Sequence, residues 1–291
     1  MKKKIAILGS TGSIGRTLLD IINKNKKNFE INLLSANRNY KKILKQAISF
    51  KVKNIIIHDL ETYENKKIMF SRKNINIFKS IQDFKKNKKI NFDYTMIGIT
   101  GFYGLEPTLE IIDITKKIAI ANKESIICGW NLINKKLKKN NTKFLPIDSE
   151  HFSINEIIKD KKREDIQKIY LTASGGPFLK KKLSELKKIK IKDAINHPTW
   201  NMGKKISIDS ATLINKVYET IEAKKIFKLN YSKLDILIQP TSYVHSIVKF
   251  YGGTIHYLIH KPSMTIPIFN SIIEDINLKK KLTSKIDNKL I

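Results

Sequence analysis

Short apolar runs alternate with longer segments of mixed polarity through the first half of the chain. Residues 4–8 form the first run, and a glycine turn and a helical pattern through Ile22 follow it. Similar runs, each about as long as a buried strand, lie at residues 31–36, 54–58, 94–99, 117–121 and 144–147. Strands that alternate with helices are typical of a doubly wound parallel sheet, so the pattern predicts an α/β fold over residues 1–147.

Strand-like runs follow one another more directly in the second half. They lie at residues 170–173, 234–239, 243–250 and 254–259, and one long helical pattern precedes the last three. Tyr251-Gly252-Gly253 separates the last two runs and is typical of a hairpin turn. The pattern predicts an α+β domain over residues 148–270, followed by a Lys-rich tail at residues 271–291.

Polar side chains come at close spacing between Asn196 and Glu222. The stretch begins as a loop, because Pro198 disfavours helix at the residue before it and Gly203 interrupts any regular run. We expect Asp209 or Ser210 to cap a helix that follows. Apolar residues recur there at helical spacing: Leu213, Ile214, Val217, Ile221 and Phe227.

One face of this expected helix can hold a phosphate or a metal-bound oxyanion. Asn215 and Glu219 are four residues apart and share that face, Glu222 follows one turn later, and Lys216 lies beside them. The alternative interpretation is a solvated amphipathic helix with an ordinary Glu/Lys surface. Trp200 in the preceding glycine loop favours a binding site, because an exposed Trp in such a loop is expected to cover a ligand.

Composition limits the possible partners. The 56 Lys and Arg residues against 26 Asp and Glu give a formal net charge of +30, which often indicates nucleic acid or an anionic membrane. Lys, Asn and Ile are abundant throughout, as in the products of AT-rich genomes, and the Lys runs lack interleaved aromatics, so we expect no nucleic-acid partner. No apolar run approaches the ~20 residues of a membrane span, and the chain leaves no room for a signal peptide, so we expect a cytoplasmic protein with no membrane partner.

The sequence contains a single cysteine, Cys128. One cysteine excludes an internal disulfide and a Cys-rich metal site, and it fits a reducing compartment. Cys128 follows two isoleucines, so we expect a small buried residue there and not the nucleophile of a semialdehyde-type dehydrogenase.

A glycine-rich turn follows the first predicted strand. Gly9, Gly12 and Gly15 have G-x-x-G-x-x-G spacing, a variant of the dinucleotide-binding fingerprint, and stand between a strand and a helix. Glycines let the backbone approach a pyrophosphate, and the helix N-terminus supplies N–H groups and positive potential. The turn therefore predicts a nucleotide cofactor.

The end of the second predicted strand bears on which nicotinamide cofactor binds. NAD enzymes usually have an acidic residue there for the ribose hydroxyl, whereas this chain has Asn37-Arg38-Asn39. No carboxylate repels a 2′-phosphate, and Arg38 can pair with one, which favours NADPH. The alternative is that Arg38 is one more surface cation of a basic chain. Residues 98–101 and 122–124 follow further strands, at the sheet edge where ligands bind.

Two carboxylates flank a serine directly after the apolar run at residues 144–147. In an extended segment Asp148 and Glu150 point the same way, and with Glu219 they offer the oxygen ligands that Mg²⁺ or Mn²⁺ prefers. The alternative is that this segment caps a helix at residues 152–158. Ser174-Gly175-Gly176 can offer a hydroxyl and N–H groups to a phosphate, or form only a tight turn.

Together these segments resemble one family, the 1-deoxy-D-xylulose 5-phosphate reductoisomerases of the non-mevalonate isoprenoid pathway. The resemblance extends from Ile5 to Pro267 and rests on blocks in the same order at residues 9–15, 121–125, 146–151, 172–178 and 197–223. It implies a Rossmann-like NADPH-binding domain, a catalytic α+β domain, and conversion of 1-deoxy-D-xylulose 5-phosphate to 2-C-methyl-D-erythritol 4-phosphate with NADPH and Mn²⁺ or Mg²⁺. It also implies a homodimer formed through the strands of the second domain.

The family's functional residues carry over to the matching positions. The resemblance assigns NADPH to Thr11, Gly12, Ser13, Ile14, Asn37, Arg38, Asn39, Asn122, Glu124 and Gly203, although Asn37 is commonly glycine in the family. It assigns the divalent metal to Asp148, Glu150 and Glu219. Substrate contacts fall on Lys123, Ser149, Glu150, Ser174, His197, Trp200, Met202, Ser210, Asn215, Lys216 and Glu219, with Trp200 and Met202 in a covering loop. The implied catalytic groups are Lys123, Asp148, Glu150, His197 and Glu219.

One departure from the family concerns length. Family members are longer and end in a helical domain, whereas this sequence stops at Ile291 in a Lys-rich segment. We therefore expect the C-terminal helical domain to be absent. Three other interpretations stay open: a weakly active or inactive relative, a plain NADP-dependent Rossmann dehydrogenase, and a basic binding protein that retains an inactive fold.

Overall fold

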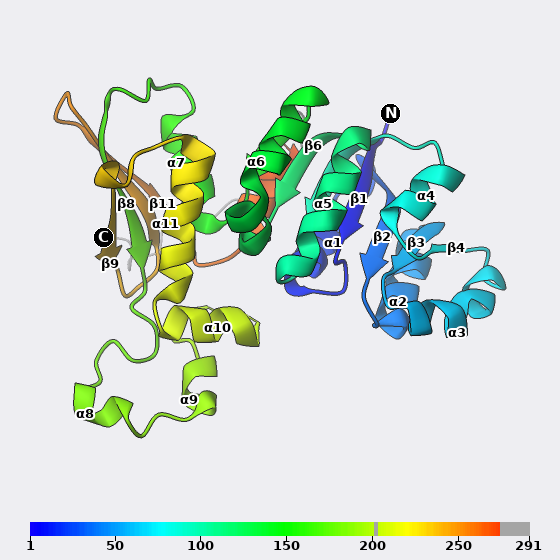
Figure 1. The fold of residues 1–291 in the computed structure, drawn as a ribbon, viewed down its shortest axis with the longest axis horizontal. Helices are drawn as coiled ribbons and strands as arrows, with labels where there is room; N and C mark the ends of the chain where they lie inside the picture. The colour runs from blue at the N-terminus through cyan, green and yellow to red at the C-terminus, as the bar shows by residue number, and fades with distance from the viewer. Residues whose placement is uncertain (201–202, 274–291) are drawn as a thin grey trace. The chain divides into compact units, whose positions relative to one another are not determined.

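A computed structural model describes residues 1–200 and 203–273. The chain divides into two compact units, one made of residues 1–147 together with the segment from Ile268, and the other of Asp148–Pro267 (Figure 1). The last described helix, α12 (Thr265–Ile273), spans the domain boundary expected at residue 270. Its residues from Ile268 onward belong to the first unit. Met202 and the expected tail beyond residue 273 lie outside the described residues.

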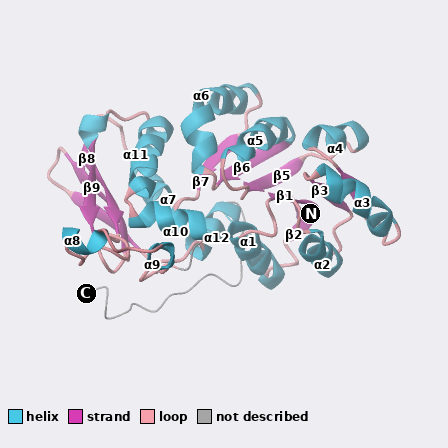
Figure 2. Cartoon of the chain, turned by 60° about the horizontal axis from the view of Figure 1, so that its bottom comes forward, coloured by secondary structure: helices cyan, strands magenta, loops and turns pink. Residues whose placement is uncertain are grey.

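A seven-stranded parallel sheet forms the centre of the first unit, in the order β4-β3-β2-β1-β5-β6-β7. The strands are β1 (Lys3–Leu8), β2 (Phe29–Ala36), β3 (Asn54–Ile57), β4 (Asn76–Phe78), β5 (Phe92–Ile97), β6 (Thr115–Ile120) and β7 (Lys143–Pro146). The main helices between them are α1 (Ser13–Lys24), α2 (Tyr40–Phe50), α3 (Leu60–Ser71), α4 (Ile81–Asn87), α5 (Leu105–Ile111) and α6 (Lys123–Lys139). Helices α5 and α6 lie on one face of the sheet and α1 and α2 on the other (Figure 2), so the predicted doubly wound fold is confirmed.

The strand order reverses direction beside β1. The chain proceeds outward from β1 to β4 and then returns to place β5 on the other side of β1. In such sheets the loops at the carboxyl ends diverge at this point and leave a crevice for a ligand. Gly9 has φ of 82°, and a Cβ at this residue would lie 2.6 Å from the backbone of Gly98. The close approach of the two loops that line the crevice therefore requires glycine at position 9.

The second unit contains a mixed four-stranded sheet in the order β11-β10-β8-β9. Its strands are β8 (Ile166–Ala173), β9 (Leu234–Ile238), β10 (Val244–Phe250) and β11 (Ile255–Ile259). Strand β8 pairs with β9 in parallel and with β10 in antiparallel orientation, and β10 and β11 form the predicted hairpin. The prediction of an α+β second domain is confirmed.

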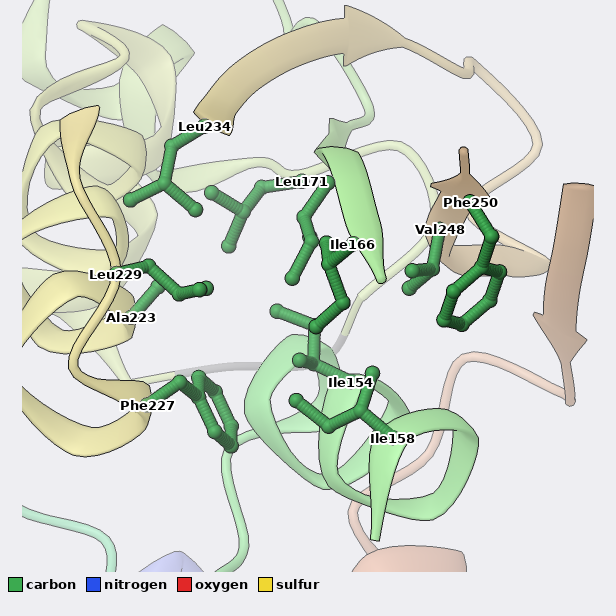
Figure 3. Close-up of a cluster of buried hydrophobic side chains, with 11 residues drawn as sticks. Ile154, Ile158, Ile166, Leu171, Ala223, Phe227, Leu229, Leu234, Val248 and Phe250 are labelled. Carbon is green, nitrogen blue, oxygen red and sulfur yellow. The ribbon is translucent and has the colours of Figure 1, made fainter. Parts of the chain in front are cut away.

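Two helices pack against one face of this sheet. Helix α7 (Ser149–Ile158) contributes Ile154 and Ile158 to the buried cluster, and α11 (Ile214–Phe227) contributes Ala223 and Phe227 (Figure 3). Leu229, just after α11, and side chains of the sheet complete the cluster: Ile166, Ile169, Leu171, Leu234, Val248 and Phe250. Burial of each large apolar side chain stabilises the unit by about 1.5–3 kcal/mol, which holds the two helices firmly against the sheet.

The helix expected to start at Asp209 or Ser210 begins elsewhere. Both residues lie inside α10 (Lys204–Ala211), and α11 starts at Ile214 after Leu213, whose φ is 60°. A left-handed residue interrupts helical hydrogen bonding, so the helical pattern is split into two helices. The prediction of a cap at these residues is therefore wrong, and Asp209 pairs with Lys205 at 2.6 Å instead. Two short helices, α8 (Leu183–Leu186) and α9 (Ile191–Ile195), had no clear signal in the sequence pattern.

Helix α11 buries charged side chains beside Ala223 and Phe227 and leaves part of its apolar pattern exposed. Ile214 and Val217 are 39% and 47% exposed, whereas Lys216, Glu219 and Glu222 are buried. Within the part of the chain that the structure describes, no helix is long and apolar enough to cross a membrane.

Candidate active site

Three carboxylates meet in the second unit. Asp148 occupies the N-cap position of α7, Glu150 lies in the first turn of that helix, and Glu219 comes from α11. One oxygen of each carboxylate lies within 4.8 Å of the others. An all-oxygen set of this kind suits a hard divalent cation, so these residues fit the metal that the sequence suggested.

The local backbone around these carboxylates differs from the extended segment that the sequence suggested. Helix α7 already begins at Ser149, three residues before the start of the expected helix, so Asp148 and Glu150 do not alternate along a strand. Asp148 does take the N-cap position of the alternative interpretation, but its side chain forms no capping hydrogen bond. The start of α7 thus positions both carboxylates. The side chain of Asp148 points to the carboxylate cluster and does not cap the helix.

A buried ammonium group lies among these carboxylates. Lys216 Nζ is 2.6 Å from Glu150 Oε1, forms an ion pair with Glu219, and donates to the carbonyl of Thr172 at 2.5 Å. Burial alone lowers the pKa of Lys216, but attraction by Glu150 and Glu219 outweighs it and raises the pKa to about 12. Lys216 is therefore charged and compensates carboxylates that would otherwise repel one another. In this structure it contacts the carboxylates, and its assignment to the substrate phosphate stays a prediction.

Side chains around the cluster hold it in place. Asn215 Nδ2 donates to Glu219 Oε1 at 2.5 Å, and Ser149 Oγ donates to Glu150 Oε2. His151 Nε2 donates to the main-chain oxygen of Glu219 at 2.9 Å, which ties α7 to α11 directly beneath the carboxylates. Asn215 and Ser149, both expected to serve the substrate, thus also orient the metal-binding candidates.

His151 and Glu222 extend the site beyond the residues assigned from the sequence. His151 Nδ1 lies 3.8 Å from Glu222 Oε2, and both residues are buried. Together with Asp148 they form a second group whose ligand atoms lie within 4.8 Å of one another. The sequence held a partial signal, because Glu222 follows Glu219 by one helical turn and His151 follows Glu150 directly.

The candidate phosphate cradle is centred on His197. Its Nδ1 accepts from the main-chain N–H groups of Thr199 and Trp200 at 3.2 and 3.0 Å. The proton of the neutral ring therefore lies on Nε2, which donates to Ser174 Oγ at 2.9 Å. Partial burial lowers the pKa of His197 below its ordinary value. The structure thus brings His197 and Ser174 together, as the sequence suggested.

The turn after Ser174 reaches the end of α10. Gly175 and Gly176 have φ of 83° and 68°, and a Cβ on Gly176 would lie 3.0 Å from the main-chain oxygen of Ser210. Glycine at position 176 therefore lets the turn approach Ser210 closely. Gly203 is the N-cap residue of α10, and Trp200 is half-buried.

The glycine turn of the first unit has the local geometry that a dinucleotide needs. Gly12 is the N-cap residue of α1, and no acidic residue stands in the first turn of that helix, so its positive N-terminal potential is not opposed there. Gly12 and Ser13 are exposed, and Thr11 and Ile14 are half-buried. All these residues lie at the reversal point of the sheet, beside β5.

Arg38 has a partner that the sequence did not reveal. Its Nε donates to Asp59 Oδ1 at 2.8 Å, and its side chain is 76% exposed. Hydrogen bonds from Thr62 and from Arg38 lower the pKa of Asp59, which keeps its carboxylate charged. Asn39 caps α2 by accepting from the N–H of Lys42. Arg38 is thus oriented at the carboxyl edge of the sheet, where the 2′-phosphate was expected.

Asn122 has a structural role in the first unit. Its side chain accepts from Ser125 N at the start of α6 and donates to the carbonyls of Ile99 and Gly101, both at 2.6 Å. These bonds hold the second glycine turn against α6. Lys123 is buried, and Glu124 lies in the first turn of the helix.

Cys128 is exposed, so the expectation of a buried position is wrong. Ile126 and Gly129 of α6 are buried instead, and the helical period places Cys128 on the exposed side of the helix.

Comparison with known proteins places these features in a family. The profile of 1-deoxy-D-xylulose 5-phosphate reductoisomerase matches residues 5–129, and that of the enzyme's C-terminal domain matches residues 144–227. The 1-deoxy-D-xylulose 5-phosphate reductoisomerase of Pelagibacter ubique (strain HTCC1062) is 55% identical over 285 residues, which cover 97% of this chain and 73% of that protein. The chain belongs to the 1-deoxy-D-xylulose 5-phosphate reductoisomerase family.

Solved structures of reductoisomerases agree with the fold. The enzyme from Zymomonas mobilis, in complex with NADPH, superposes with a TM-score of 0.88 at 33% identity and covers 100% of this chain and 75% of its own. A second reductoisomerase, in complex with NADPH, fosmidomycin and magnesium, gives a TM-score of 0.85 at 32% identity, with coverage of 96% and 72%. The chain therefore spans about three quarters of the length of these reductoisomerases.

Proposed function

We infer that this protein catalyses the NADPH- and metal-dependent rearrangement and reduction of 1-deoxy-D-xylulose 5-phosphate to 2-C-methyl-D-erythritol 4-phosphate, a step of isoprenoid precursor biosynthesis. The observation that carries the inference is the meeting of Asp148, Glu150 and Glu219 around one point. Family membership supports it, as do the reductoisomerase structures that contain NADPH, fosmidomycin and magnesium.

The three carboxylates would hold Mg²⁺ or Mn²⁺. When bound, the metal supplies Lewis-acid polarisation of the substrate's carbonyl and hydroxyl oxygens, which favours rearrangement of the carbon skeleton. Asn215 and Ser149 keep the carboxylates oriented, as their hydrogen bonds to Glu219 and Glu150 indicate. This orientation lowers the cost of ordering the site when ligands bind.

The substrate phosphate would lie near His197 and Ser174, with Ser210, Asn215 and Lys216 as further contacts. Ser174 Oγ accepts from His197 Nε2 and from the N–H of Gly176, so its own hydroxyl proton can be donated to a phosphate oxygen. We propose that Trp200 and Met202 cover the bound sugar and exclude water, and that Lys123 contacts the substrate beside the metal.

NADPH would bind at the reversal point of the parallel sheet. The glycine turn and the N-terminus of α1 would receive the pyrophosphate, and Asn37, Arg38 and Asn39 the 2′-phosphate. Asn122, Glu124 and Gly203 remain proposed cofactor contacts. NADPH supplies the hydride that reduces the rearranged aldehyde.

We further propose a homodimer in the cytoplasm that forms through the open face of the second unit's sheet. Tyr170, Ile247 and Tyr257 are opposite one another in register, and they alternate with the residues that face the helices. Tyr257 is 55% exposed, and Ile255 and Ile259 on the same edge strand are 48% and 43% exposed. Tyr257→Lys should weaken the dimer in sedimentation experiments, and an unchanged dimer would exclude this face.

Steady-state oxidation of NADPH tests the proposed function directly. Turnover should require both 1-deoxy-D-xylulose 5-phosphate and Mn²⁺ or Mg²⁺, and fosmidomycin should inhibit it. An inactive relative would still bind NADPH in a fluorescence titration but show no turnover. A plain dehydrogenase would oxidise NADPH with an aldehyde substrate after chelation of the metal, which would contradict the proposal.

A further inference from the structure

Four aromatic rings form a continuous column within the second unit. Trp200 lies edge-on to His245 with a centroid separation of 6.0 Å, and Phe152 lies edge-on to His260 at 6.2 Å. Between these ends, His245 and His260 are stacked at 3.6 Å with an interplanar angle of 19°. The four residues come from the loop before α10, strand β10, the segment after β11, and helix α7.

The two histidines are held in fixed orientations. His245 Nε2 donates to the main-chain oxygen of His260 at 3.1 Å, and His260 Nδ1 donates to the main-chain oxygen of Lys261 at 2.7 Å. His245 is 2% exposed and His260 is 9% exposed. Burial is the largest cause that lowers the pKa of both rings, that of His245 to about 3. Both are therefore neutral near pH 7, and no like-charge repulsion opposes the stack.

The loop that carries Trp200 is held by hydrogen bonds to two other segments of the second unit. His197 bonds to Ser174 after β8, and Thr199 Oγ1 bonds to Ser242 Oγ before β10 at 2.9 Å. These bonds fix the backbone of the loop but leave the indole ring to be placed by what it touches. Within the described part of the chain, the indole of Trp200 makes its one aromatic contact with His245.

The other end of the column reaches the helix of the metal-binding candidates. Phe152 lies in the first turns of α7, and its N–H donates to the main-chain oxygen of Asp148 at 2.8 Å. The column therefore connects the Trp200 loop to the helix that begins with the carboxylate cluster.

We propose that His245 and His260 are positioning residues that place the indole of Trp200 over the sugar-phosphate site. They act through Trp200 and do not themselves contact the substrate. The stack provides a rigid, flat support for the indole, whereas an aliphatic side chain would leave it free to change rotamer. The proposal rests on the proposed function only in its second test.

The first test measures Trp200 directly and needs no turnover. The chain has two tryptophans, so Trp130→Phe leaves Trp200 as the sole indole. In that background, His260→Leu removes the ring, and His260→Phe retains one. Both variants lose the Nδ1 hydrogen bond, so their difference isolates the ring. We expect His260→Leu to shift the Trp200 emission and to increase its quenching by acrylamide about twofold or more, and His260→Phe to stay near the parent.

The second test measures steady-state constants of the same variants. We expect His260→Leu to raise KM for 1-deoxy-D-xylulose 5-phosphate about three- to tenfold, with little change in KM for NADPH or in the Mn²⁺ dependence, and His260→Phe to stay within about twofold of the parent. Equal emission in both variants, or an equal rise of all constants in His260→Leu, would overturn the proposal. If the parent showed no turnover, the proposed function would fail while the emission test still decided this one. Should His260→Leu not fold, His260→Gln takes its place in both tests.

Discussion

The two candidate sites of this protein are built in opposite ways. The cofactor site of the first unit consists largely of backbone: a glycine turn, a helix N-terminus and the ends of parallel strands. The site of the second unit consists of buried charged side chains from α7 and α11, which lie more than sixty residues apart in sequence. A backbone site depends on local conformation, whereas a buried charge cluster depends on every partner being present. Single substitutions should therefore affect the two sites very differently.

The largest effect is expected for Glu219→Gln. The change removes one of three carboxylates that fit a divalent cation and alters the balance around Lys216. Because Lewis-acid catalysis is worth several kcal/mol, we expect kcat/KM to fall more than about 100-fold, with partial recovery at high Mn²⁺. Glu156→Gln, an exposed pair partner of Lys159 on α7, is the matched control and should be near the parent. An unchanged Mn²⁺ dependence in Glu219→Gln would show that this carboxylate does not bind the metal.

Lys216→Met tests whether the cluster depends on its internal cation. Removing the ammonium leaves buried carboxylates without their counter-charge, which costs about 3–5 kcal/mol in comparable buried pairs. We expect a marked fall in melting temperature without metal, and a larger rise on addition of Mn²⁺ than in the parent, because the metal replaces the missing charge. Lys224→Met, at an exposed position of the same helix, should neither lower the melting temperature nor enlarge its rise on addition of Mn²⁺. Equal metal-induced shifts in Lys216→Met and the parent would contradict the charge-compensation argument.

In the first unit, Gly9→Ala should be the most damaging single change to the backbone site. A Cβ would lie 2.6 Å from the backbone of Gly98, and φ of 82° is unfavourable for alanine. We expect a loss of about 1–3 kcal/mol in stability and weaker NADPH binding, since the turn must move. Gly252→Ala is the control, because a Cβ there meets nothing within 4 Å. Thermal unfolding and NADPH titration of the two variants measure the difference, and equal results would mean that the two loops can separate without cost.

Acid should destabilise the second unit more than the first. Burial lowers the pKa of His197, His245 and His260 there, against His58 alone in the first unit. For His245 the causes after burial are repulsion by protonated His260 and by Lys216, which also lower its pKa, and the hydrogen bond to the His260 main chain and the charge of Asp148, which raise it.

The sign of the acid effect follows from the lowered pKa values. Below the ordinary value of about 6.5 the unfolded chain binds protons that the folded chain refuses, so stability is lost as pH falls. For His245, with a pKa of about 3, the loss between pH 7 and pH 5 is about 2 kcal/mol. Urea unfolding at both pH values, followed by the emission of Trp200 and of Trp130 in single-Trp variants, measures it. Equal losses in both units would contradict the prediction.

The sequence predicted the two folds well because their signals are local. Each apolar run of the first half became a strand, and the glycine turn identified the crevice beside β1. The three-residue strand β4 was missed because it is too short to show a period. On α11 the apolar pattern was right for Phe227 but wrong for Ile214 and Val217, which are exposed. Lys216 is buried there instead, because Glu150 and Glu219 compensate its charge.

Contacts between distant residues could not be predicted in the same way. His245 and His260 become neighbours only through the register of the β10–β11 hairpin, in which Val244 pairs with Ile259. Asp59 reaches Arg38 because β2 and β3 end side by side. The carboxylates were named from their spacing and then from the family resemblance, but the position of Lys216 between them required the packing of α11 on β8. Sequence patterns thus identified the elements and many site candidates, whereas the charge pairing between elements needed the tertiary structure.

The smallest effect is expected for Arg38→Asp, because this side chain is exposed and works in water. The variant places a carboxylate beside Asp59, where the 2′-phosphate is expected, so NADPH should bind more weakly while NADH changes little. We expect the ratio of the Kd for NADH to the Kd for NADPH to fall about tenfold in Arg38→Asp, and this fall to be smaller at high salt. Arg72→Asp makes the same change of charge at the end of α3 and controls for the net charge of the chain.

A second variant, Asp59→Asn, keeps the guanidinium of Arg38 but removes the carboxylate that Arg38 Nε contacts. A weaker NADPH preference in Asp59→Asn would show that orientation matters as well as charge, whereas equal use of both cofactors by the native protein would contradict the role of Arg38.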